Sequence, residues 1–154
     1  MTDELKVPKR RAKVEVLLAG GLARQVTLFL AEFASVHAGP ERVSDLLNEA
    51  GGFLPAVDLA TDAMTFLNRT AIALARVSRE WEGDDDSAGG DEQEVEIILS
   101  GGSALRGTLR FLQPPGRARL QDYLNDAPPF LRLAQDTEVV LVNKQHVARV
   151  SKVK

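Results

Sequence analysis

The chain offers few of the side chains from which catalytic or metal sites are built. Its two histidines, His37 and His146, lie far apart, and neither has another histidine or an aspartate at a metal-binding spacing. It has no cysteine, which excludes a disulfide framework, a thiol nucleophile and a zinc–thiolate site. We therefore predict neither a bound metal nor a cofactor.

Two pairs of carboxylates occupy matching places in the two halves of the chain, Asp45 with Asp122 and Glu15 with Glu96. A general acid–base pair needs two carboxyl groups in one cleft, with pKa values that the environment pushes apart. The two aspartates instead lie where short helices are expected to begin, and there they can cap free backbone N–H groups. We expect no catalytic residue here and no enzymatic activity.

Glycine pairs follow two of the expected strands, Gly20-Gly21 and Gly101-Gly102. A phosphate-binding loop would lead from a strand into a helix, but each of these pairs leads into another strand. Glycine suits tight hairpin turns because it adopts positive φ without steric cost. Ser100, beside the second pair, does not stand in the strand–turn–helix elbow of a nucleophilic serine.

All these matches belong to an internal repeat. Residues 14–21 (VEVLLAGG) return as 95–102 (VEIILSGG), and 42–49 (RVSDLLNE) return as 119–126 (RLQDYLND). Further on, Phe53-Leu54 returns as Phe130-Leu131, and residues 75–78 (ARVS) return as 148–151. Because the order is the same both times, we predict a tandem of two similar small units. The predicted segments are a disordered basic lead-in at 1–12, a first unit at 13–78, a flexible acidic linker at 79–94 and a second unit at 95–154.

Each unit is expected to begin with a β-hairpin and to contain one short helix. Residues 95–100 and 105–111 follow a period-two pattern on either side of the glycine turn, broken only by the apolar Ile98 in the more polar set. In the first unit Val43, Leu46 and Leu47 have the i, i+3, i+4 spacing of one helical face. The asparagines that follow, Asn48 and Asn125, are expected to cap the helix or to bridge to the backbone of a neighbouring strand.

Residues 64–77 look helical by composition, since they contain several alanines. The repeat nevertheless places them on 138–150, which reads as two strands around an Asn143-Lys144-Gln145 turn. We give position in the repeat more weight than local propensity, which is a weak guide. The repeat alignment sets Asn68-Arg69 on Asn143-Lys144 and residues 75–77 on 148–150, with a two-residue insertion between them.

Two resemblances support this reading. The hairpin at 95–109 and the closing stretch 139–150 resemble the two motifs of Sm-like proteins, which implies a small barrel. Sm barrels begin with a helix, whereas here the helix follows the second strand, so no binding residue is carried over. The whole order, with Arg-Leu-x-Asp-Tyr-Leu-Asn before Phe130, resembles a small bacterial domain family of unknown function, which implies a topology and no activity.

The predicted fold class is therefore mainly β. We expect two tandem small antiparallel β-barrel-like units of the Sm or SH3-like kind, each with one short helix, packed as a pseudo-two-fold pair. Units of this size bury a modest fraction of their surface, so they are expected to pack on each other or on another chain.

Charge is divided unevenly along the chain. Residues 79–94 carry eight acidic groups and one basic group, while residues 95–154 carry nine basic and five acidic groups. A basic small barrel could follow a phosphate backbone, which is the alternative reading as an RNA- or DNA-binding protein. Its candidate contacts are Arg106, Arg110, Arg117, Arg119, Arg132 and Lys144.

Without catalytic groups, the preferred prediction is a protein-binding or scaffolding module whose partner is another protein or a second copy. The three aromatic residues of the second unit are expected in its core, whereas single-stranded nucleic acid needs exposed stacking platforms. No apolar run reaches the roughly 18 residues of a membrane helix, and no signal-peptide core follows the N-terminus. We expect a bacterial cytoplasmic protein that does not bind membranes.

Overall fold

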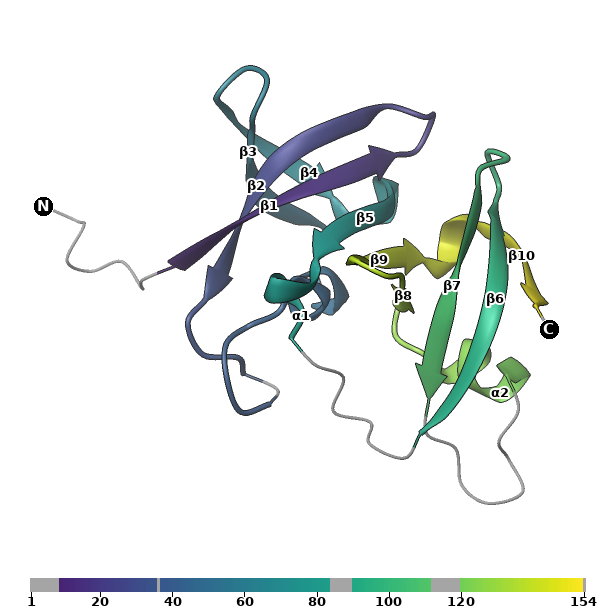
Figure 1. Cartoon of the computed structure of the whole chain (residues 1–154). Coiled ribbons are helices and arrows are strands. Elements are labelled where there is room, and N and C mark those ends of the chain that lie inside the picture. Colours follow the sequence, from purple (N-terminus) through teal and green to yellow (C-terminus); the bar gives the residue numbers. More distant parts are fainter. Residues whose placement is uncertain (1–8, 36, 84–89, 112–119, 154) are drawn as a thin grey trace, which may run out of the picture.

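The computed structural model of the chain describes residues 9–35, 37–83, 90–111 and 120–153. These residues form ten antiparallel strands in one open sheet, with two short α-helices (Figure 1). The first unit comprises β1 (Lys9–Leu18), β2 (Ala23–Ala31), α1 (Val43–Asn48), β3 (Phe53–Asp58), β4 (Ala63–Asn68) and β5 (Ile72–Ser78). The second comprises β6 (Asp91–Leu99), β7 (Ala104–Phe111), α2 (Leu120–Asp126), β8 (Phe130–Ala134), β9 (Glu138–Asn143) and β10 (Val147–Lys152). The mainly β prediction is confirmed.

The two units share one strand order. The first runs β5-β1-β2-β3-β4 and the second β10-β6-β7-β8-β9, and the pairing of β5 with β9 makes them one sheet. We call this pairing and the contacts around it the join. In the described part of the chain no strand pairing closes either unit into a barrel, and the sheet is open.

The predicted pseudo-two-fold packing is wrong. A two-fold axis between the units would place equivalent strands opposite each other. The join instead pairs the last strand of the first unit with the fourth strand of the second. The reason is that the first unit contributes its β5 edge to the join and the second contributes its β9 edge, and these two strands are not equivalent.

Both expected glycine hairpins are present. β1 pairs with β2 and β6 with β7 along most of their length, and the turns contain Gly20 at φ 92° and Gly102 at φ 99°. These positive φ values explain why glycine is needed at the two turns.

The strand prediction for residues 64–77 is confirmed, because they form β4, a 3₁₀ turn at Arg69–Ala71 and β5. Asn68 and Asn143 begin equivalent turns, and their side chains accept hydrogen bonds from Thr70 N at 3.2 Å and Gln145 N at 3.0 Å. Local propensity for helix is thus overruled by sheet pairing on both sides of β5.

The predicted insertion after Asn68 is wrong. Ala75 pairs with Val16, and Val150 pairs with Ile97, so Ala75 is equivalent to Val150 and not to Ala148. The two extra residues lie between β3 and β4. There residues 59–62 separate Asp58 from Ala63, whereas only 136–137 separate Gln135 from Glu138. A surface turn absorbs the length difference more easily than a strand buried in the join.

The apolar core has two parts that share the strands of the join. The first lies under α1 and includes Val139 and Leu141 of the second unit, together with Phe130. The second lies in the second unit and includes Ala73 and Leu74 of the first. Alternate residues of β5 and β9 therefore point into different cores, as period-two strands covered on both faces must. The two units pack together as expected, because β5 and β9 each contribute side chains to both cores.

Two predicted boundaries shift. The predicted lead-in at 1–12 overlaps β1, which starts at Lys9, because Ala12 is a buried core residue and its neighbours pair with β2. The predicted linker at 79–94 keeps Arg79–Trp81 as a 3₁₀ turn and gives Asp91–Glu94 to β6. Residues 1–8 and 84–89 lie outside the described residues.

Candidate functional site

Within the part of the chain that the structure describes, the open sheet ends in two strands that have one neighbour each, β4 and β10. An edge strand presents unpaired backbone N–H and C=O groups, and proteins often shield such edges with charged side chains. β10 carries Arg149 and Lys152, both exposed, whereas the β4 sequence Ala-Met-Thr-Phe-Leu-Asn carries no charge. The β4 edge is therefore the less protected of the two.

Beside the β4 edge, three large apolar side chains face solvent. Phe53 is 66% exposed, Met64 56% and Phe66 64%. The register sets Phe66 opposite Pro55 and Met64 opposite Val57, and residues directly opposite each other share a face of the sheet. We call Phe53, Met64 and Phe66 the apolar patch. Exposed apolar side chains grouped in this way are typical of protein-binding sites.

The matching positions of the second unit are buried. By strand register Phe53 corresponds to Phe130, since each stands opposite the asparagine that ends the next strand. Counting back from those asparagines, Phe66 corresponds to Leu141 and Met64 to Val139. These three equivalents are 3%, 0% and 2% exposed, and all belong to the core under α1. In the second unit, then, this face is covered by protein, and what covers it is the first unit.

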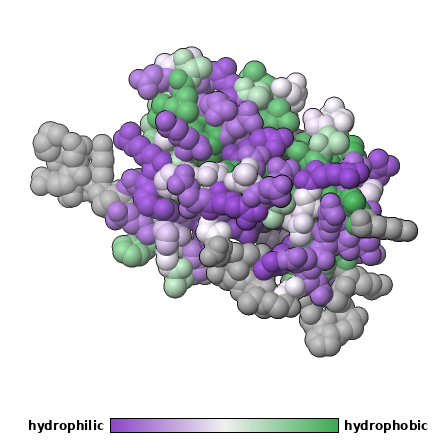
Figure 2. Space-filling model, viewed as in Figure 1, coloured by the Kyte–Doolittle hydropathy of each residue, from purple (hydrophilic) through white to green (hydrophobic). Residues whose placement is uncertain are grey.

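Figure 2 shows hydrophilic atoms over the middle of the molecule on the face seen in Figure 1. The hydrophobic atoms visible on that face gather mainly toward its upper part, where Figure 1 places the β3–β4 hairpin and the far ends of β1 and β2. The visible surface is therefore not uniformly polar.

Two asparagines supply polar contacts across the join. Asn48, at the end of α1, accepts a hydrogen bond from the Phe130 backbone N–H at 2.8 Å. Asn143 Nδ2, which is buried, donates to the Ile72 carbonyl at 2.9 Å and to the Arg69 carbonyl at 3.4 Å. Of the two roles expected for Asn48, capping the helix or bridging to a neighbouring strand, the structure shows the bridge. Side-chain amides that bridge the two units in this way orient one unit on the other.

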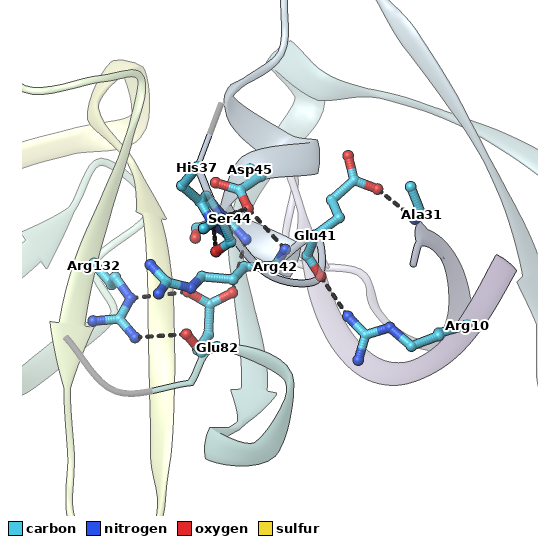
Figure 3. Close-up of polar contacts among 10 residues, drawn as sticks. Arg10, Ala31, His37, Glu41, Arg42, Ser44, Asp45, Glu82 and Arg132 are labelled. Atoms are coloured by element: carbon cyan, nitrogen blue, oxygen red, sulfur yellow. Dashed lines mark hydrogen bonds and ion pairs between the residues drawn. The ribbon is translucent and has the colours of Figure 1, made fainter. Parts of the chain in front are cut away.

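Glu82 fastens the join from the other side (Figure 3). It is 0% exposed, although it belongs to the stretch whose composition indicates a linker. Its Oε1 accepts from Arg132 Nε of β8 at 2.9 Å, and its Oε2 accepts from the Ser44 N–H at 2.8 Å. Because both oxygens are engaged, the burial of this charge is compensated, and α1 and β8 are held in fixed positions.

The loop before α1 is tied down at several points (Figure 3). Arg10 Nη2 donates to the Glu41 carbonyl at 2.6 Å, and Glu41 Oε1 accepts from the Ala31 N–H at 2.8 Å. The Arg10 guanidinium also lies 5.3 Å from the centre of the Trp81 ring. Trp81 packs against the first core.

His37 has hydrogen-bond partners at both ring nitrogens. Nδ1 lies 2.8 Å from the Ala38 carbonyl oxygen, and Nε2 lies 2.6 Å from Asp45 Oδ2. Since both partners are acceptors, the doubly protonated ring satisfies them best. The Ala38 carbonyl and then the Asp45 carboxylate raise the pKa of His37 above its ordinary value, while burial and Arg42 oppose them. Asp45 also accepts from the Arg42 N–H at 2.8 Å, so it caps the helix as expected.

Asp58 makes a similar anchor between β2 and β3. Arg24 Nε donates to Asp58 Oδ2 at 2.8 Å, and Asp58 Oδ1 accepts from the Ala60 N–H at 2.9 Å. The Arg24 guanidinium, helped by the backbone of Ala60 and Thr61, lowers the pKa of Asp58 against the opposing effect of burial. This pair stabilises the turn that leads to β4.

The predicted nucleic-acid contacts separate into two places. Three of them, Arg106, Arg110 and Arg132, line a cleft of about 960 Å³. Four acidic residues and one further arginine share its wall: Glu92, Glu94, Asp136, Glu138 and Arg79. Arg106 lies 3.6 Å from Glu96, Arg110 pairs with Glu92, and Arg132 pairs with Glu82.

Lys144 lies elsewhere, and its Nζ donates to the carbonyls of Leu124 at 2.9 Å and Ala127 at 2.7 Å. Arg117 and Arg119 lie outside the described residues. All four described candidates therefore have partners within the chain, and the cleft that three of them line has balanced charge.

Sequence reasoning missed the apolar patch. Met64 and Phe66 lie in a stretch assigned as strand by the repeat, but period-two alternation does not say which face is covered. The available signal was the difference between the repeats. β9 reads Glu-Val-Val-Leu-Val-Asn, with four consecutive apolar residues that occupy both faces of the strand. In β4, which reads Ala-Met-Thr-Phe-Leu-Asn, the polar Thr65 interrupts the apolar run.

Neither a metal centre nor a membrane helix is seen in the described ranges. No three histidine, aspartate or glutamate side chains there come together in a way that could hold a metal ion. Over the same residues, no helix has the length and apolar character needed to cross a bilayer. Comparisons with protein-family models, with curated proteins and with solved structures find no match to this chain.

Proposed function

We propose that this chain is a protein-binding module with a scaffolding role, which docks a partner on the β4 edge and the apolar patch. The proposal includes no enzymatic activity, and the bacterial cytoplasm is the compartment we expect. Strand addition at a sheet edge supplies main-chain hydrogen bonds, and neighbouring apolar side chains add specificity. The β4 edge and the patch offer both.

One observation carries the proposal. Phe53, Met64 and Phe66 are each more than half exposed, while Phe130, Val139 and Leu141 at the equivalent positions are covered by protein. The same face of the repeated unit is therefore exposed in the first unit, whereas in the second unit other parts of the chain cover it. Leaving such side chains in water forgoes about 1.5–3 kcal/mol each, which a bound partner would recover in part.

Site-specific photo-crosslinking tests the proposal. A photoreactive phenylalanine analogue at position 66, in the cell that naturally produces the protein, should form a covalent protein adduct that mass spectrometry identifies. The matched control places the same analogue at Phe33, an aromatic residue that is 81% exposed and lies outside the patch. The docking role is refuted if position 66 yields no more adduct than position 33.

The alternative function, RNA or DNA binding by the basic second unit, has the cleft around Arg106 in its favour, since Arg106 is largely exposed there. The acidic residues of the same wall would repel a phosphate backbone. We therefore rank it below protein binding.

A further inference from the structure

We infer that the occupant of the β4 edge is a second copy of this chain, docked head to tail through its β10 and α2. This inference rests on the proposed function and names the partner. In it, β10 and α2 of one copy cover β4, β3 and the apolar patch of the next, as β5 and α1 cover β9 and β8 within one chain.

The join supplies the template. Inside the chain it pairs β5 with β9, the fifth strand of one unit with the fourth strand of the other. The strands left at the two edges, β10 and β4, are their equivalents. Because the join pairs non-equivalent strands, it can be repeated from copy to copy, which is the defining property of a heterologous interface.

The apolar surfaces left open at the two ends are complementary. Next to the join, Leu47 on α1 and Ala75 on β5 are fully buried. Their equivalents at the free end, Leu124 on α2 and Val150 on β10, remain partly exposed. These side chains are the surface on which the apolar patch of another copy would lie.

The asparagines of the join are also duplicated. Asn125 is the equivalent of Asn48; it is exposed, and its side chain has no hydrogen-bond partner among the described residues. By analogy it would accept from the Phe53 N–H of the second copy, which corresponds to the Phe130 N–H. Asn68 is the equivalent of Asn143, and its Oδ1 accepts hydrogen bonds from Thr70 N at 3.2 Å and from Thr70 Oγ1 at 3.0 Å. Its amide nitrogen is left to donate to the carbonyl of Val147, the equivalent of Ile72.

The analogy predicts a register. Within the chain Ala75 stands opposite Leu141 and Arg76 opposite Val140. Between copies Val150 would therefore stand opposite Phe66, and Ser151 opposite Thr65. β10 differs from β5 in carrying Arg149 and Lys152 where β5 has Leu74 and Val77. The contact between copies is accordingly less apolar than the join, and we expect it to be reversible and dependent on concentration.

Disulfide trapping tests this register, because the chain has no cysteine of its own. Full-length Thr65→Cys and Ser151→Cys proteins are mixed and oxidised, as are Phe66→Cys and Val150→Cys. Opposite pairs in antiparallel strands alternate between Cα separations of about 5.5 Å and about 4.5 Å, and two consecutive pairs are tested so that both spacings are sampled. The expected result is a crosslinked dimer in at least one mixture, with none from Thr65→Cys mixed with Gln25→Cys, since Gln25 is exposed on β2 away from the edge.

Two results would overturn the inference. Crosslinking of Thr65→Cys with itself, at the expense of the mixture, indicates a two-fold β4–β4 pair. Absence of crosslinks in both mixtures at a protein concentration of about 1 mM indicates that copies do not associate this way. If the position-66 photo-adduct is then a different protein, this inference fails while the docking function stands.

A matched pair of variants separates association from folding. Asn125→Ala should weaken self-association about five- to tenfold in sedimentation velocity while leaving the thermal midpoint unchanged. Asn48→Ala should lower the thermal midpoint, because it removes the equivalent bond inside the chain. An Asn125→Ala protein that associates as tightly as the parent contradicts the proposed interface.

Discussion

Glu82 and Arg132 are 50 positions apart in the chain, and they form an ion pair with Glu82 Oε1 2.9 Å from Arg132 Nε. The Glu82 side chain is fully buried, whereas about a quarter of the Arg132 side chain is exposed. The pair fastens the segment after β5 to β8, so it belongs to the join as much as the strand pairing does.

Replacing Glu82 by alanine should therefore destabilise the whole chain. Arg132 would lose its buried partner and the Ser44 backbone N–H would lose its carboxylate acceptor, and breaking a buried pair costs about 3 kcal/mol or more. Urea unfolding followed by circular dichroism measures the change. Glu80→Ala is the control, since Glu80 is exposed, and should change the free energy of unfolding by less than about 0.5 kcal/mol. Equal effects of the two substitutions would show that the Glu82 contacts do not stabilise the fold.

His37 should make stability depend on pH. Its pKa is raised in the folded chain, so its stabilising contribution is complete below the unfolded value of about 6.5 and is lost as pH rises through the folded pKa. The difference in free energy of unfolding between the parent and His37→Gln should therefore be larger at pH 5.5 than at a pH above the folded value.

An NMR titration provides the direct measurement, since the chain has only two histidines. The His37 ring should titrate at a higher pH than an unperturbed histidine, and Asp45→Asn should bring it down. A His37 resonance that titrates at or below the ordinary value would contradict the two-acceptor geometry.

Gly107 should not tolerate a side chain. A Cβ there would lie 2.6 Å from the Ala134 carbonyl oxygen and 2.7 Å from Leu133 Cγ, because β7 and β8 approach closely. We expect Gly107→Ala to cost about 1–3 kcal/mol of stability through overpacking. Gly101→Ala is the matched control, since its Cβ would meet nothing within 4 Å. Thermal unfolding of both variants tests the prediction, and equal midpoints would contradict it.

Nucleic acid should not bind. Arg106, Arg110 and Arg132 are paired with acidic side chains of the same chain, so few counterions would be released from RNA or DNA. A gel shift with single-stranded and double-stranded probes at about 20 mM and 150 mM salt should show no complex. A complex at low salt that Arg106→Ala removes would favour the alternative function.

The repeat and its alternation were sufficient to predict the strands and the two helices, including β4 and β5 against their helical composition. They could not predict the join. Nothing in a period-two pattern says that β5 pairs with β9, although the unbroken apolar run Val139-Val140-Leu141-Val142 is typical of a strand covered on both faces.

The site escaped prediction for a related reason. Phe53 and Phe130 are the same residue type in the same place of the repeat, yet one is exposed and the other is buried. Phe130 is buried because the first unit packs against it, whereas no unit packs against Phe53 among the described residues. The sequence of a single repeat does not specify which unit will pack beside it. Glu82 was misjudged because average composition hides a single buried contact.

The two cores exchange side chains across β5 and β9, and this has a consequence for how the protein can be divided. Cutting between residues 83 and 90 would strip Ala73 and Leu74 from one core and Phe130, Val139 and Leu141 from the other. Neither fragment should then persist as a folded domain, and calorimetry of the intact chain should record one cooperative melting event rather than two. The two repeated units should therefore unfold together as a single thermodynamic unit.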